Sequence, residues 1–145
     1  MASLDQRPTV GPVPSRTSRW SEYTRLSRQI KQAGLLDRRR GWYAAEIGLN
    51  LGLLAAGGVA FVLLGDSWWQ LLTAAYLAVV FTQLTFVGHD AGHRQIFRSR
   101  RANDLVGLFH GNLLVGISFG WWVPKHNAHH SNPNDEELDP DIGIA

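Results

Sequence analysis

Two long apolar segments stand back to back in this sequence, and they restrict its fold more than any other feature. No Lys or Arg occurs between residues 42 and 87, and a Gly-Asp-Ser turn at residues 65–67 divides the stretch in two. A helix rises about 1.5 Å per residue, so about 20 residues cross the hydrocarbon of a bilayer. The segments 42–64 and 68–87 are both long enough. The sequence therefore predicts an all-α integral membrane protein with a two-span helical hairpin.

The charged residues around this hairpin predict its orientation. Residues 1–41 form a basic amino-terminal region with nine Lys and Arg against three acidic residues, and four arginines follow the hairpin between residues 94 and 101. Because basic residues beside membrane spans stay on the cytoplasmic side, the amino terminus and the segment after the hairpin are expected in the cytoplasm. Nucleic-acid binding would also explain the bases. Their place beside a membrane segment instead favours the lipid bilayer as partner, and no nucleic acid is expected.

Two smaller features give specific expectations. Prolines at positions 8, 12 and 14 predict a disordered start to the basic region, which a surface helix then follows. Glu46 and Asn50 lie one helical turn apart near the start of the first span. They either face a partner helix or lie shallow in the membrane interface, and we expect the shallow position.

Five of the six histidines fall in two compact clusters. His89 and His93 are four residues apart, and His126, His129 and His130 have the spacing i, i+3 and i+4. Residues three or four apart lie on one face of a helix, so each cluster can direct its imidazoles one way. The chain has no cysteine, and imidazole suits iron, copper, zinc or nickel, so ligand type does not name the metal. Alone, the first pair could be solvated at a helix end; together, the clusters predict a shared metal site.

Residues 88–145 are expected to form the interfacial and cytoplasmic region that carries these clusters. Pro124 suits the first turn of the second cluster's helix, and Asn132-Pro133-Asn134 is expected to end it. If residues 105–123 crossed the bilayer, the two clusters would lie on opposite sides. The four glycines of this segment, together with His110, favour a helix that lies in the interface or dips in and returns. His110 itself belongs to neither cluster and is expected to be structural or interfacial.

The acidic run from Asp135 to Asp141 is expected to be a solvated loop, with a docking patch for a basic carrier as the alternative.

The clusters resemble the first and second histidine boxes of the membrane fatty acid desaturases. His-Asp-Ala-Gly-His at 89–93 and His-Asn-Ala-His-His at 126–130 match these boxes. The likeness continues through 130–134 and 138–141, which are similar to the sequence that many bacterial acyl desaturases carry there, of acyl-CoA or acyl-lipid type. It covers residues from about 42 to 141. The resemblance implies four membrane helices under a cytoplasmic cap, with two iron ions held by histidines from three boxes.

The resemblance also implies roles for single residues. Asp90 is similar to the acidic residue of the first box; it could accept the outer N–H of a ligand imidazole or cap a helix. Trp121 and Trp122 could line an acyl channel or anchor their segment at the headgroups, and the anchor is expected. The implied iron ligands are the five box histidines, His89, His93, His126, His129 and His130.

The activity that the resemblance implies is the oxygen-dependent introduction of a double bond into the acyl chain of a lipid or acyl-CoA. Electrons would come from an external donor: ferredoxin, a flavin reductase or cytochrome b5. Three residues separate the histidines of the first box, which looks more like acyl-lipid or front-end desaturases than the stearoyl-CoA type.

The third box of the family pattern does not occur in these 145 residues. We therefore expect the two-iron centre to need ligands from outside this chain, and the chain alone to be inactive. Three alternatives stay open: a membrane di-iron hydroxylase or ketolase of the same superfamily, a non-catalytic metal-binding membrane fragment, and a soluble helical metal protein.

Overall fold

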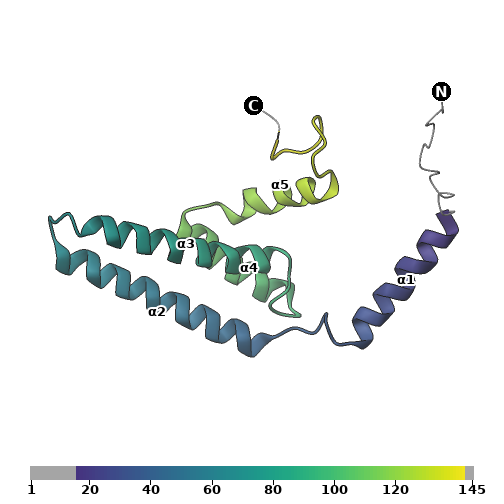
Figure 1. Ribbon diagram of the computed structural model, residues 1–145, viewed down its shortest axis with the longest axis horizontal. Helices are drawn as coiled ribbons and strands as arrows, with labels where there is room; N and C mark the ends of the chain where they lie inside the picture. Colours follow the sequence, from purple (N-terminus) through teal and green to yellow (C-terminus); the bar gives the residue numbers. More distant parts are fainter. Residues whose placement is uncertain (1–15, 143–145) are drawn as a thin grey trace, which may run out of the picture. The chain divides into compact units, whose positions relative to one another are not determined.

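The computed structural model describes residues 16–142, which are helical throughout apart from the connecting turns and contain no strand. The elements are α1 (Arg16–Gln32), α2 (Arg40–Leu64), α3 (Gln70–Gly92), α4 (Arg100–Leu108), the π-helix η1 (Phe109–Val115) and α5 (Phe119–Ser131) (Figure 1). This architecture confirms the predicted all-α class. Residues 1–37 and 38–145 form two separate units. The helix predicted in the basic region is present as α1, whereas the disorder predicted for its start concerns residues outside the described range.

α2 and α3 form the predicted membrane hairpin and lie side by side (Figure 1). They have 25 and 23 residues, and both are long and apolar enough to span a membrane. The turn between them begins at Gly65, whose φ of 53° lies in the left-handed region that favours glycine. The side-chain amide of Gln70 donates to the carbonyl oxygens of Phe61 at 2.7 Å and Gly65 at 2.9 Å, and so satisfies acceptors at the end of α2.

A close approach of the two spans fixes their register. Gly57 of α2 faces Leu77 and Tyr76 of α3, and a Cβ atom at Gly57 would collide with the Leu77 side chain. One turn away, the Tyr76 hydroxyl donates to the carbonyl oxygen of Leu53 at 2.8 Å. Asn50, also on α2, is 3% exposed. This burial favours the alternative for Asn50, a residue that faces a partner helix, over the shallow interfacial position that was expected.

After the hairpin the chain folds back through a bent helical segment. The residues 100–115 and 119–131 form two helical arms bent by 110° at a short break, so a straight third span is absent from the described residues. Gly116 allows the break with a φ of 81°, and the Asn112 side chain closes it by accepting from the Phe119 N–H at 2.9 Å. α5 consequently returns to contact the end of α3. The bend rules out a straight span through residues 105–123, and the position of this segment in the membrane interface stays a prediction.

α5 begins earlier than Pro124 suggested. The Ser118 hydroxyl caps the helix by accepting from the Trp121 N–H at 3.3 Å, so the first turn starts at Phe119 and Pro124 lies inside the helix. The end of the helix is as predicted, since α5 stops at Ser131, directly before Asn132.

The Phe119 ring packs against the backbone of α4 at Gly107, where a Cβ atom would overlap the ring. We expect Gly107→Ala to destabilise the chain by about 1–3 kcal/mol, because the ring is buried and cannot move away freely. Gly120→Ala is the matched control, since a Cβ there meets nothing within 4 Å. Chemical unfolding in detergent, followed by circular dichroism, measures both. Equal stability of the two variants would contradict this packing.

Candidate metal centre

Four of the five box histidines converge at one point. His89 and His93 come from the end of α3, and His126 and His130 from α5. The His126 Nε2 lies 3.1 Å from the Nε2 of His89, 3.1 Å from that of His93 and 3.0 Å from that of His130. One ring nitrogen from each of the four lies within 4.8 Å of the others. The bend before α5 thus brings together two pairs that are more than 30 residues apart in sequence.

This arrangement fits a metal cation better than a hydrogen-bond network. A single imidazole nitrogen can share only one proton, yet the Nε2 of His126 contacts three other nitrogens. A metal–nitrogen bond of about 2.0–2.1 Å with ligand angles of about 90–110° separates neighbouring ligand nitrogens by about 2.9–3.4 Å. The observed separations of 3.0–3.1 Å fall within this interval.

The electrostatics of the cluster also suit a cation. Burial lowers the pKa of His93, and the neighbouring His89 and His130 lower it further. Burial likewise lowers the pKa of His126, with added repulsion from the other three histidines. Both imidazoles are therefore neutral at physiological pH, which is the form with a lone pair to donate to a metal.

His129, the fifth predicted ligand, lies apart from this group. Its Nδ1 is 2.9 Å from both carboxylate oxygens of Asp139 and 3.6 Å from Asp141 Oδ2. Asp139 is 2% exposed, so the solvated position expected for the acidic run is wrong for this residue. Asp141 forms an ion pair with Lys125 of α5 at 2.8 Å, which holds the loop against the helix.

Asp90 lies beside the cluster in the last turn of α3. Its Oδ1 is 3.2 Å from the Nδ1 of His89, and its Oδ2 accepts from the Tyr43 hydroxyl at 2.8 Å. The described contacts therefore favour the carboxylate–imidazole pair over the helix cap. Tyr43 was not identified from the sequence, since it comes from the start of α2, 47 residues away, and no spacing connects the two.

Because Tyr43 restrains Asp90, we expect Tyr43→Phe to weaken metal binding by about tenfold, at the lower end of what the loss of such outer contacts costs. Tyr76→Phe is the matched control: it removes one hydroxyl hydrogen bond from the same hairpin, to Leu53, outside the cluster. Titration with Co²⁺, followed by visible absorption, gives both affinities. An equal loss in the two variants would mean that Tyr43 only stabilises the hairpin.

The two tryptophans have different surroundings. Trp121 is 60% exposed, with the Lys125 ammonium 5.4 Å from its ring centre, as an interfacial anchor would be. Trp122 instead stacks on His126, with ring centres 4.3 Å apart and planes at 19°. A Cβ atom at Gly92 would lie 2.7 Å from the Trp122 ring, so glycine is needed there for the ring to reach the cluster. The anchor expected for both residues therefore does not describe Trp122.

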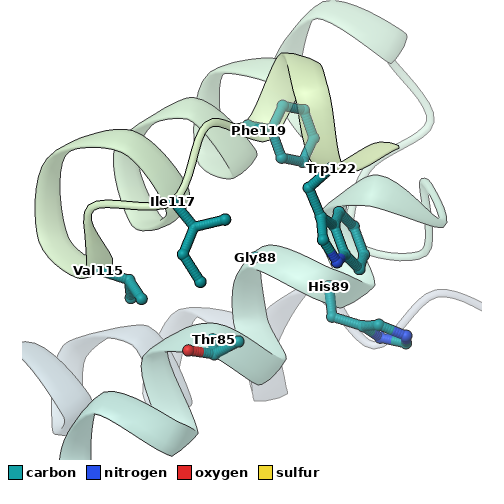
Figure 2. Close-up of a pocket in the computed structure, with 8 residues that line it drawn as sticks. Thr85, Gly88, His89, Val115, Ile117, Phe119 and Trp122 are labelled. Atoms are coloured by element: carbon teal, nitrogen blue, oxygen red, sulfur yellow. The ribbon is translucent and has the colours of Figure 1, made fainter. Parts of the chain in front are cut away.

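An apolar pocket opens directly beside the cluster. Figure 2 shows it between α3 and the bend, with His89 and Trp122 at one end and Val115, Ile117 and Thr85 at the other. Phe119 covers it, and Gly88 and Gly111 complete the lining. The sequence did not identify this pocket, because its walls come from three elements whose arrangement depends on the bend.

His110 lies outside the cluster, as predicted. It is 1% exposed, and its Nδ1 donates to the carbonyl oxygen of Val106 at 2.9 Å.

The comparison with known families decides the identity. A model of the fatty acid desaturase family matches residues 66–145, which include both histidine boxes. The chain belongs to the fatty acid desaturase family. This confirms the resemblance seen in the sequence, and the family is generally iron-dependent, in agreement with the histidine cluster. With its two apolar helices, this member of the family is an integral membrane protein.

The curated relatives of this chain are named as desaturases. A Delta(8)-fatty-acid desaturase of Helianthus annuus is 33% identical over 83% of the chain, and a Delta 8-(E)-sphingolipid desaturase of Kluyveromyces lactis is 37% identical over 84%. The chain spans 26% and 21% of their respective lengths. These relatives are eukaryotic, so the bacterial subtype stays a prediction. No solved structure matches the chain.

Proposed function

We propose that this chain supplies the first membrane hairpin and two histidine boxes of an enzyme that introduces a double bond into a lipid acyl chain, with O₂ as oxidant. The observation that carries the proposal is the convergence of four imidazoles beside an apolar pocket. Neither feature alone would suffice, since a metal site needs no pocket and an apolar pocket needs no metal. Together they support a site in which an apolar chain would lie next to a redox centre.

His89, His93, His126 and His130 would hold one iron ion through neutral imidazole nitrogens. Two irons bound by histidines would supply the activation of oxygen and the removal of hydrogen from two neighbouring methylene groups. The second iron would be held by His129 and by ligands from outside this chain. The five box histidines alone are too few for two iron coordination spheres of about four to six ligands each.

The other residues of the site act by placement. A methylene group offers no polar handle, so only the shape of the pocket can select which carbon reacts. Phe119 covers the pocket, and Trp122 closes it against the imidazole of His126. We propose that these rings exclude water and hold the acyl chain against the His89 side of the cluster. The substrate classes to test first are those in the relatives' names, fatty acids and sphingolipids.

The arginines on both sides of the hairpin favour histidine boxes on the cytoplasmic side of the membrane. An external donor, whether ferredoxin, a flavin reductase or cytochrome b5, would reach the site from there.

The proposal is tested by exchange with a relative. Residues of this chain replace the aligned segment of the Kluyveromyces lactis sphingolipid desaturase, and the chimera is produced in a yeast strain that lacks this desaturase. We expect unsaturated sphingoid bases, detected by mass spectrometry, from the chimera and from its Asn127→Ala variant. The His126→Ala variant should give none. A chimera that reaches the membrane in the amount of the native enzyme, binds iron and makes no double bond would contradict the proposal.

A further inference from the structure

Asp139 is a buried carboxylate that lies directly after the second histidine box. It is 2% exposed, and both of its oxygens lie 2.9 Å from the His129 Nδ1. Oδ2 also accepts from the Asn134 N–H at 2.8 Å, and Oδ1 from the Asp141 N–H at 2.9 Å. Burial of a charge is costly unless hydrogen bonds compensate it, and here each oxygen has at least two donors.

These bonds decide which nitrogen of His129 carries the proton. Both Asp139 oxygens already accept from backbone N–H groups, Oδ1 from Asp141 and Oδ2 from Asn134, which is the pattern of a carboxylate that acts only as an acceptor. An ionised carboxylate can only accept hydrogen bonds, so the Nδ1 of His129 must be the donor. In a neutral imidazole, Nε2 is then unprotonated and has its lone pair free for a metal.

The first box has the same arrangement. The Nδ1 of His89 faces Asp90 at 3.2 Å, and its Nε2 is the nitrogen that points into the four-histidine group. A carboxylate on the outer nitrogen of a metal-binding histidine fixes the tautomer and the ring orientation. In each box, therefore, one histidine has its outer nitrogen held by an aspartate.

A cation bound between His129, Asp139 and Asp141 would be the competing explanation. The positive partners of this group are already present, however. Asp141 pairs with the Lys125 ammonium at 2.8 Å, and the Asp139 oxygens are used by backbone N–H groups. The short Nδ1–oxygen distances are those of hydrogen bonds.

We propose that Asp139 is a positioning residue that keeps His129 in the Nδ1–H tautomer, with Nε2 as a ligand atom for a metal outside the four-histidine group. This inference rests on the proposed function, which provides that second metal. It gives a role to the Asp-Pro-Asp sequence after the second box and explains why His129 stands apart from its two neighbours on α5.

The test uses the full 145-residue chain in detergent micelles, free of metal and labelled with ¹⁵N in its histidines. Nitrogen chemical shifts distinguish the two tautomers, and the His129→Gln spectrum identifies the His129 signals. We expect Nδ1–H for His129 in the unsubstituted chain and in Asp141→Asn, the matched control from the same loop. In Asp139→Asn the side-chain amide can donate to Nδ1, so the Nε2–H tautomer should appear.

Two results would overturn the inference. One is an Nε2–H tautomer for His129 in the unsubstituted chain, which needs no variant to fold. The other is an equal change of the His129 tautomer in Asp139→Asn and Asp141→Asn, which would indicate a cation site or a general loosening of the loop. Failure of the proposed function would look different: the unsubstituted chain would bind no iron at all, whatever the tautomer of His129.

Discussion

Replacing His126 by alanine is expected to reduce metal binding by more than 100-fold. His126 is the centre of the cluster, because its Nε2 is within 3.1 Å of the nitrogens of His89, His93 and His130. Loss of a ligand costs at least as much as loss of an outer partner, for which about 10–100-fold is usual. His130→Ala should cost less, about tenfold, because the His130 Nε2 contacts His126 at the edge of the group.

Metal content after dialysis against Fe²⁺ under anaerobic conditions measures this effect. Asn127→Ala is the control, since Asn127 is exposed on the same helix and is not one of the four clustered histidines. The order of affinities should be the unsubstituted chain and Asn127→Ala, then His130→Ala, then His126→Ala. Full metal content in His126→Ala would show that the four nitrogens do not share one ion.

Replacing Asn103 by leucine is expected to destabilise the chain by about 3 kcal/mol. Asn103 is fully buried, and its side chain accepts from the Phe97 N–H at 3.1 Å. It also donates to the carbonyl oxygens of Phe97 and Ser99, both at 2.8 Å. Leucine is similar in size but leaves the N–H and the carbonyl oxygen of Phe97 without partners, and each unpaired buried group costs about 1–3 kcal/mol. The Ser99 carbonyl oxygen loses one of its two donors and keeps the backbone N–H of residue 103.

The affected loop joins the first histidine box to α4, so the same change should also lower metal affinity. Asp104→Ala is the control, because the neighbouring Asp104 makes only an exposed ion pair with Arg100 at 3.8 Å, a contact worth about 0–1 kcal/mol. Unfolding in a denaturing detergent, followed by circular dichroism, compares the two. If Asn103→Leu and Asp104→Ala unfold at the same detergent concentration, the buried hydrogen bonds of Asn103 do not stabilise this loop.

The membrane hairpin could be predicted from the sequence because a segment that faces lipid must consist almost entirely of apolar residues. A span must be apolar almost all round, so its length and its ends are visible without any knowledge of its partners. The burial of Asn50 could not be predicted in this way, because it depends on the packing of α2 against the rest of the protein.

The convergence of the two boxes was predicted from topology, but the division of the second box was not. Successive residues of a helix are about 100° apart, so His129 and His130 point in directions that differ by that angle, with His126 between them. The sequence spacing puts all three histidines on one side of the helix but does not determine which two face α3. The tilt of α5, set by the break at Gly116 and the packing of Phe119, selects His126 and His130.

The outer partners of the cluster were the least predictable part of the site. Asp90 was identified because it lies within the first box, next to the histidine that it contacts. Tyr43 reaches Asp90 from another helix, and Asp139 lies in an acidic run that resembles any solvated loop. Only the folded chain shows that one carboxylate of this run is buried while its neighbours are exposed.

X-ray absorption at the iron edge of the Fe²⁺-loaded chain is the most direct test of the central claim, that both boxes bind one metal through imidazole. We expect a first shell of nitrogen at about 2.0–2.2 Å, as for other imidazole–metal bonds, with the outer-shell scattering of several imidazole rings. This imidazole signal should fall in His126→Ala and stay unchanged in Asn127→Ala. A first shell of oxygen without imidazole scattering would contradict the account.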